Sequence, residues 1–293
     1  MRIALLGSTG MLGSTIAKYL SRSNLELWEY NRAGISIIPG NMTQILDVTS
    51  EESVSEFLKK EDFDYVINGI GLIKQLIKED SEEHIKLAFQ INSNFQGTLN
   101  EYSQHTSTPV IQIGTDCVYS GKQGFYDERS EFDCSDVYGL SKVEGESRSK
   151  SLMILRSSIV GHELNSTTSL MDWFGNLEVD AKVRGYTNHF WNGVTTLAFA
   201  RIVGGIINTG NFESGTMHVV PGNQVSKYQL LKEFQIAFGR SDIFIEPYAH
   251  EISINRTLST IYPEKNSRLW SQAGYNEIPT VHEMVQEYAL WAR

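Results

Sequence analysis

A tyrosine and a lysine stand four positions apart in the segment Tyr138-Gly-Leu-Ser-Lys142. Residues at this spacing lie on the same face of a helix, so the lysine ammonium is expected close to the phenol. A neighbouring positive charge favours the phenolate and brings the pKa of a tyrosine toward working pH. Upstream, Thr115 follows the apolar run 110–114 and can offer a hydroxyl to the same ligand oxygen. These residue types predict proton donation to a carbonyl oxygen while a hydride arrives from a nicotinamide.

A glycine-rich loop at the start of the chain is the predicted site for the hydride carrier. It lies between an apolar strand pattern and an amphipathic helix pattern and consists of Gly7, Ser8, Thr9, Gly10, Met11, Leu12 and Gly13. Glycines allow a tight turn and a close approach to a pyrophosphate, whose charge the helix N-terminus receives. The spacing is GxxGxxG rather than GxGxxG, and glycines alone would equally suit a structural turn. The strand–loop–helix context favours nucleotide binding.

The end of the second strand indicates which nicotinamide cofactor fits. An acidic residue there would bind the adenosine ribose, whereas an arginine accommodates a 2′-phosphate. The strand ends in Tyr30, Asn31 and Arg32, so NADP(H) is favoured, with a solvated surface role for Arg32 as the alternative. Asp47 and Val48 follow the next apolar run. The Asp47 carboxylate would either meet the adenine amino group or cap a loop.

The chain as a whole is acidic and otherwise ordinary in composition. Its 293 residues are 41% hydrophobic, and 25 Lys and Arg against 35 Asp and Glu give a net charge of −10. This charge argues against a nucleic-acid or anionic-membrane surface, and no run reaches the ~18 apolar residues of a membrane span. Cys117 and Cys134 cannot form a disulfide framework, and no metal-ligand spacing is present. With no signal-peptide pattern, we expect a cytoplasmic protein without a metal site.

Short apolar runs alternate with amphipathic stretches in the first half, which is typical of βαβ units. Predicted strands cover 2–6, 25–30, 65–70, 110–114 and 152–160, and predicted helices include 51–60 and 81–105. Asn92 lies in the apolar stripe of the long helix, where it would anchor the backbone near Lys142, support a proton relay or be a structural residue. The second half shows no clean strand between 161 and 193, and helices are predicted at 195–207, 227–238 and 281–291.

Together these patterns predict an α/β fold: a Rossmann-type doubly wound parallel sheet with a smaller mixed α/β C-terminal substrate domain. We expect an NADP-binding domain over 1–161 and a mainly substrate-binding domain over 162–293, with the chain crossing back near 193–222. A homodimer is possible, because a long amphipathic helix such as 81–105 can pair two subunits or cover its own sheet.

Several motifs resemble those of extended short-chain dehydrogenase/reductases, and their order is similar to the dTDP-4-dehydrorhamnose reductase family of nucleotide-sugar reductases. They are the GSTGMLG loop, the NGIG segment 68–71, the GTDCVYSG segment 114–121, the Tyr138/Lys142 pair and Leu155-Arg156-Ser157. The resemblance implies NADPH-dependent reduction of the 4-keto group of a nucleotide-linked 6-deoxyhexose, in deoxysugar or cell-surface polysaccharide biosynthesis. It further implies a catalytic triad of Thr115, Tyr138 and Lys142, and a cofactor site that includes Gly69, Ile70 and Gly71.

Two alternatives stay open at this point. Cys117 stands where related dehydratases carry Glu, and together with His162 it resembles the proton-transferring pair of GDP-fucose synthases, which epimerise before reducing. A bifunctional epimerase/reductase would use both side chains; the alternative is that Cys117 is a small buried residue and His162 a polar loop residue. A non-catalytic NADP-binding regulatory subunit is the other alternative, because a fold does not fix a function.

The substrate side is predicted from residue types alone. Four aromatic residues are candidates for stacking on a nucleobase: Trp173, Tyr186, Trp191 and Tyr262. Arg184 and Arg256 are candidates for holding a diphosphate, and Asn255-Arg256-Thr257-Leu258 resembles a stretch that contacts the substrate diphosphate in some extended members. Such aromatic residues also serve as core or interface residues.

Overall fold

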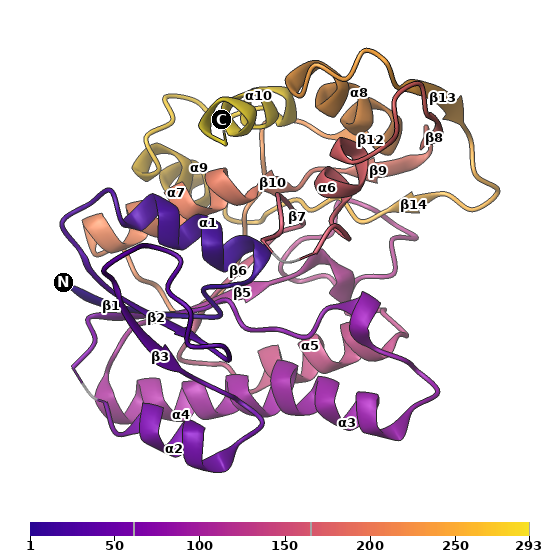
Figure 1. Cartoon of the computed structure of the whole chain (residues 1–293). Helices are drawn as coiled ribbons and strands as arrows, with labels where there is room; N and C mark the ends of the chain where they lie inside the picture. Colours follow the sequence, from indigo (N-terminus) through magenta and orange to yellow (C-terminus); the bar gives the residue numbers. More distant parts are fainter. Residues whose placement is uncertain (61, 165, 293) are drawn as a thin grey trace.

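The computed structural model describes residues 1–60, 62–164 and 166–292, and its centre is a seven-stranded parallel sheet (Figure 1). The strand order is β11-β6-β5-β4-β1-β2-β3. These strands are β1 (Arg2–Leu6), β2 (Glu26–Asn31), β3 (Met42–Ile45), β4 (Tyr65–Asn68), β5 (Val110–Gly114), β6 (Met153–Arg156) and β11 (Gly215–His218). The chain winds outward from β1 in one direction and from β4 in the other. The predicted doubly wound α/β fold is confirmed, and the switch between β1 and β4 is where such sheets bind ligands.

Helices cover both faces of this sheet because the central strands carry consecutive apolar residues, whose side chains point alternately to the two faces. In β1, Ile3 and Leu5 pack with helix α1, whereas Ala4 and Leu6 pack toward α2 and α4 on the other face. Figure 1 shows these two helical layers on either side of the sheet. The helices of the layers are α1 (Met11–Leu20), α2 (Glu51–Leu58), α3 (Glu82–Phe89), α4 (Phe95–Thr106), α5 (Val137–Ser147), α7 (Thr196–Thr209) and α9 (Pro263–Gln272).

Smaller elements form a C-terminal lobe beyond the carboxyl ends of the strands (Figure 1). We use this term for the short strand groups β7–β10, β12–β9–β14 and β8–β13, together with α6, α8 and α10. The strands are β7 (Ile159–Val160), β8 (Lys182–Tyr186), β9 (His189–Trp191), β10 (Val194–Thr195), β12 (Val225–Ser226), β13 (Phe244–Tyr248) and β14 (Ile254–Asn255). The helices are α6 (Leu170–Gly175), α8 (Lys227–Ala237) and α10 (Val281–Trp291). Between the segments that form this lobe, the chain returns to the large sheet as α7 and β11.

Three local expectations differ from the structure. The predicted strand 152–160 is two strands, because the chain leaves the large sheet after β6 and β7 pairs instead with β10. The predicted helix 81–105 contains a π-helical turn, Gln90–Asn94, between α3 and α4. The region 161–193 does contain strands, β8 and β9. β8 pairs with β13, and β9 pairs with β12 and β14, all more than thirty residues farther along the chain, so these strands have no local signal.

None of the helices within the described part of the chain is long and apolar enough to cross a membrane. The same residues contain no group of three or more His, Cys, Asp or Glu side chains arranged to hold a metal ion.

Candidate functional site

The glycine-rich loop turns sharply between β1 and α1 and leaves the helix N-terminus open. Gly7 has a φ of +80°, which favours glycine, and a Cβ at Gly13 would lie 2.1 Å from the Gly7 carbonyl oxygen. Gly10, the N-cap residue of α1, offers no side chain to its amide N–H groups. By contrast, a serine caps α2 and Asp136 caps α5. Uncapped N–H groups at the positive end of a helix suit a phosphate.

The adenosine end of the predicted cofactor site lies beside this loop. The Asn31 amide donates to Ser8 Oγ at 2.9 Å and to the Ile35 carbonyl at 2.8 Å, so it fixes the turn after β2. Arg32 is exposed. The Asp47 carboxylate accepts hydrogen bonds from the Thr49 backbone and hydroxyl, which lower its pKa. Asp47 therefore caps its loop, and Val48 beside it is buried.

A cavity of about 420 Å³ lies at the carboxyl ends of β1, β4 and β5, and it gathers most of the predicted catalytic and cofactor residues. Its lining contains Gly10, Met11, Leu12, Gly69, Ile70, Gly71, Thr115, Cys117, Tyr138 and Lys142. Gly7 packs against the Gly69–Ile70 backbone behind it. The glycine loop, the segment after β4 and helix α5 therefore meet around one space.

Tyr138 and Lys142 project from α5, as their spacing predicts. The Lys142 Nζ lies 5.9 Å from the centre of the Tyr138 ring. Asp136 begins the helix by accepting from the Gly139 backbone at 3.0 Å, and Lys74 pairs with the same carboxylate at 2.9 Å. The first turn of α5 is thus held from two directions.

The protonation states of this pair differ from the expectation. Burial raises the pKa of Tyr138, nearby Cys117 and Asp116 raise it further, and the hydrogen bond with Thr115 acts in the opposite direction. Burial also lowers the pKa of Lys142 to about 8. The sequence predicts that Lys142 lowers the pKa of the phenol, but desolvation of the phenol is the largest effect and raises it. A neutral phenol is the form that a proton donor requires.

Asn92 ties the segment after β4 to α5. Its Oδ1 accepts from the Leu72 backbone N–H at 2.9 Å, and its Nδ2 donates to the Leu72 carbonyl and to Ser141 Oγ, both at 3.0 Å. The π-helical turn places this buried amide beside the cavity. These bonds agree with two of the predicted roles, anchoring of the backbone near Lys142 and a structural amide.

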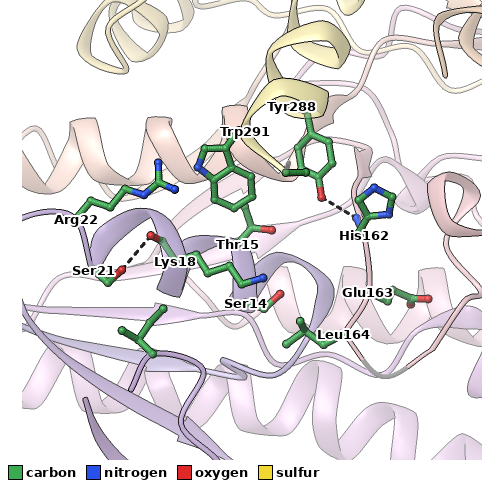
Figure 2. Close-up of a pocket in the computed structure, with 12 residues that line it drawn as sticks. Ser14, Thr15, Lys18, Ser21, Arg22, His162, Glu163, Leu164, Tyr288 and Trp291 are labelled. Atoms are coloured by element: carbon green, nitrogen blue, oxygen red, sulfur yellow. Dashed lines mark hydrogen bonds between the residues drawn. The ribbon is translucent and has the colours of Figure 1, made fainter. Parts of the chain in front are cut away.

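Cys117 and His162 do not come together. Cys117 lines the cavity described above, where burial raises the pKa of its thiol to about 12. His162 lines a different cavity of about 380 Å³ between α1, α10 and the segment after β7, shown in Figure 2. Its Nδ1 bonds to Asp172 Oδ1 at 2.5 Å, and its backbone N–H donates to the Tyr288 hydroxyl at 2.9 Å. The two side chains therefore line separate cavities.

Sequence reasoning missed a lysine on the substrate side. Lys227 directly follows β12, Trp191 ends β9 and Arg256 follows β14, and the three-stranded group β12–β9–β14 brings them together. The Lys227 Nζ lies 5.5 Å from the Trp191 ring centre. Both cations act electrostatically on Asp116 and Cys117. Only the pairing of strands distant in sequence could have revealed this cluster.

The other predicted substrate residues lie apart from this cluster. Trp173 and Tyr262 are each 40% exposed. Arg184 is an exposed residue that stacks on Tyr248, its guanidinium 4.6 Å from the ring centre. Tyr186 packs against His189, with ring centres 4.5 Å apart. Trp191, by contrast, belongs to the cluster, where it is buried and donates from its indole to Ser158 Oγ.

The sequence matches the model of the family described as the RmlD substrate binding domain over residues 1–268. The chain belongs to this family. The match includes the glycine loop, the cavity and the β12–β9–β14 group. Comparison with curated proteins found no significant match.

Solved structures with the same fold cover nearly the whole chain. A dTDP-4-dehydrorhamnose reductase from Clostridium acetobutylicum is 22% identical, with a TM-score of 0.75, over 100% of this chain and 99% of that one. A dTDP-4-dehydrorhamnose reductase from Bacillus anthracis, solved in complex with NADP, is 18% identical, with a TM-score of 0.77, over 99% of both chains. A UDP-glucuronic acid 4-epimerase from Bacillus cereus is 14% identical, with a TM-score of 0.73, over 100% of both. At these identities the comparisons show a shared fold, which reductases and epimerases both use.

Proposed function

We propose that this protein is an NADPH-dependent reductase of the short-chain dehydrogenase/reductase type, which reduces the 4-keto group of a nucleotide-linked 6-deoxyhexose. One observation carries the proposal: Thr115, Tyr138 and Lys142 line the same cavity as the uncapped N-terminus of α1. A reductase of this type needs a proton donor beside a dinucleotide site. Membership of the RmlD family and the NADP complex of the Bacillus anthracis protein support the cofactor assignment.

The residues around the cavity fit NADP(H). The open amide groups of α1 suit the pyrophosphate, and Arg32 at the end of β2 suits a 2′-phosphate. The bound cofactor would supply the hydride. Tyr138 would donate its phenolic proton to the carbonyl oxygen, and Thr115 would hold that oxygen in place. Lys142, buried beside Tyr138, would bind the nicotinamide ribose and stabilise the phenolate that proton donation leaves.

The cluster of Lys227 and Arg256 supports an anionic substrate. Among the described residues, the Lys227 ammonium has no hydrogen-bond or ion-pair partner, and the terminal nitrogens of Arg256 have none either. Lys227 and Arg256 are partly buried, and partly buried cations without partners are costly unless a ligand pairs with them. In a nucleotide-linked hexose, the phosphate on C1 lies across the ring from C4. Cations beside Asp116, the residue after Thr115, therefore suit the phosphate of a sugar whose 4-keto oxygen contacts Thr115.

The test is loss of NADPH absorbance with a panel of dTDP-, UDP- and GDP-4-keto-6-deoxyhexoses. NADH is run in parallel. Tyr138→Phe removes the phenolic hydroxyl, and with it the donated proton, and should lower kcat by about 10²–10⁴-fold while NADPH still binds. Tyr262→Phe, which removes a hydroxyl from an exposed tyrosine, serves as the matched control.

Turnover that depends on Tyr138 supports the reductase, and the preferred sugar identifies the substrate. Tight NADPH binding without turnover of any of these sugars would instead favour a regulatory subunit. A Tyr138→Phe variant as active as the parent would refute the catalytic role of the phenol. Solvent deuterium on the sugar ring carbons of the product would show an additional epimerisation.

A further inference from the structure

A buried glutamate continues the row of Tyr138 and Lys142 along α5. Glu146 lies one turn beyond Lys142, and its side chain is only 7% exposed. Its carboxylate acts electrostatically on two cations, Lys142 and Arg156. Of these it forms an ion pair with Arg156 through Oε2, while its Oε1 has no hydrogen-bond partner among the described residues. Burial raises the pKa of the Glu146 carboxyl, and the positive charges of Arg156 and Lys142 oppose this shift by favouring the carboxylate.

Arg156 is fixed so firmly that it can hold this carboxylate in place. The guanidinium, 2% exposed, donates from Nη1 to the Tyr119 hydroxyl at 3.0 Å and to His218 Nε2 at 2.7 Å. His218 Nδ1 lies 2.7 Å from the Ser259 carbonyl, which can only accept, so Nδ1 carries the proton. Nε2 is then the acceptor for Arg156. Burial and Arg156 lower the pKa of His218 to about 4, which agrees with a neutral ring.

Of the groups around Lys142, Glu146 is the main one that stabilises its positive charge. From α5 itself, Tyr138 and Glu146 face the ammonium. From the elements packed against it come the uncharged Asn92 amide and the Gly71 backbone. Asp116 and Cys117 act on Tyr138, whereas Glu146 is the charged group that raises the pKa of Lys142 against the effect of burial.

We propose that Glu146 is a positioning residue, whose carboxylate, fixed by Arg156, keeps Lys142 protonated beside Tyr138. The inference rests on the proposed function, since it gives Lys142 its working form in that reaction. Removing the negative charge would leave Lys142 and Arg156 as two buried cations. Lys142 would then lose its proton at a lower pH.

The first test measures Lys142 directly, without turnover. Acetic anhydride reacts with amines but not with ammonium groups, so the rate of Lys142 acetylation against pH, read by peptide mass spectrometry, reports its titration. Exposed Lys150 is the internal reference. Glu146→Gln should move the Lys142 curve down by about one pH unit. Glu144→Gln, which removes the same charge from an exposed pair with Arg148 on the same helix, should leave the curve in place.

The second readout is the pH profile of kcat/KM, whose alkaline limb should move down with the labelling curve in Glu146→Gln. If Glu146→Gln does not fold, Glu146→Asp is used in its place. The aspartate keeps the carboxylate but is shorter by one methylene, so the negative charge lies farther from Lys142. Its curve should move in the same direction by less. An unchanged Lys142 titration in a folded Glu146 variant would overturn the proposal. If the parent protein reduces none of the keto-sugars, the proposed function fails while the labelling result still decides the role of Glu146.

Discussion

Two lysines of the site have a similarly lowered pKa but different surroundings. Lys142 and Lys227 both have a pKa lowered to about 8 by burial. Lys142 lies between Tyr138 and Glu146 inside the cofactor cavity, whereas Lys227 stacks on Trp191 at the substrate side. The first is therefore assigned to cofactor and proton chemistry and the second to recognition of an anion.

Replacing Lys227 with methionine should weaken substrate binding selectively. The side chain keeps its length and its contact with Trp191 but loses its charge, so the KM for the nucleotide sugar should rise about tenfold or more while kcat changes little. Initial rates against sugar concentration measure this. Lys232→Met, at a half-buried lysine of α8 that donates to Gln235, is the matched control. A rise in KM for NADPH alone would contradict the assignment.

The charge of Lys227 also predicts a pH effect. A lysine ammonium exists below its pKa, so the charge that binds the phosphate is present at neutral pH and is lost as pH rises through about 8. The KM of the parent protein for the sugar should therefore rise above this pH. In Lys227→Met the KM should already be high and should stay flat over the same range. A parallel rise in the variant would assign the effect to another group.

At the scale of elements, the π-helical turn Gln90–Asn94 shapes the cavity wall. Its extra residue turns Asn92 toward the backbone of Leu72 and the hydroxyl of Ser141, so one amide connects three elements. Such turns often mark functional sites. Here the turn lets Asn92 connect the segment around Leu72, which lines the cavity, to helix α5.

Asn92→Ala should loosen this wall without touching the reacting atoms. Three hydrogen bonds are lost, and the segment after β4 that lines the cavity is no longer anchored. We expect the Kd for NADPH to rise about tenfold, with a smaller effect on kcat. Fluorescence titration of NADPH measures the change. Asn94→Ala, in the same turn but exposed and bonded to Arg148, should bind NADPH as the parent does, and equal losses in both variants would refute the anchoring role.

The sequence predicts what is local in this site and misses what is not. The glycine loop and the Tyr138/Lys142 pair can be predicted from the sequence, because their spacing within one turn or one helix determines where they lie. The sequence does not predict Lys227 as a site residue, because its position depends on the pairing of β12 with β9, which lies more than thirty residues earlier. His162 lies away from Cys117 for a related reason. After β6 the chain leaves the large sheet, and β7 places His162 next to α10.

At the scale of the whole molecule, one apolar core joins the sheet to the C-terminal lobe. Ile3 of β1 and Phe234 of α8 belong to the same cluster of buried side chains, which continues through α1, α7 and α10. A continuous core makes the two parts cooperative, because neither can unfold without exposing the apolar surface of the other. The cofactor cavity and the substrate cluster should therefore keep their relative placement.

Phe234→Ala tests this cooperativity. The ring is fully buried and packs against Phe174 and Phe238, with ring centres 6.0 and 5.9 Å away, so its loss should lower the free energy of unfolding by about 3–5 kcal/mol. Hydrogen exchange with mass spectrometry should then show reduced protection in β1 as well as in α8, although β1 lies outside the lobe. Ile236→Ala, 63% exposed on the same helix, should change stability by less than about 0.5 kcal/mol. Parent-like protection of β1 beside a destabilised α8 would instead mean that the lobe unfolds on its own and that the substrate cluster can separate from the cofactor cavity.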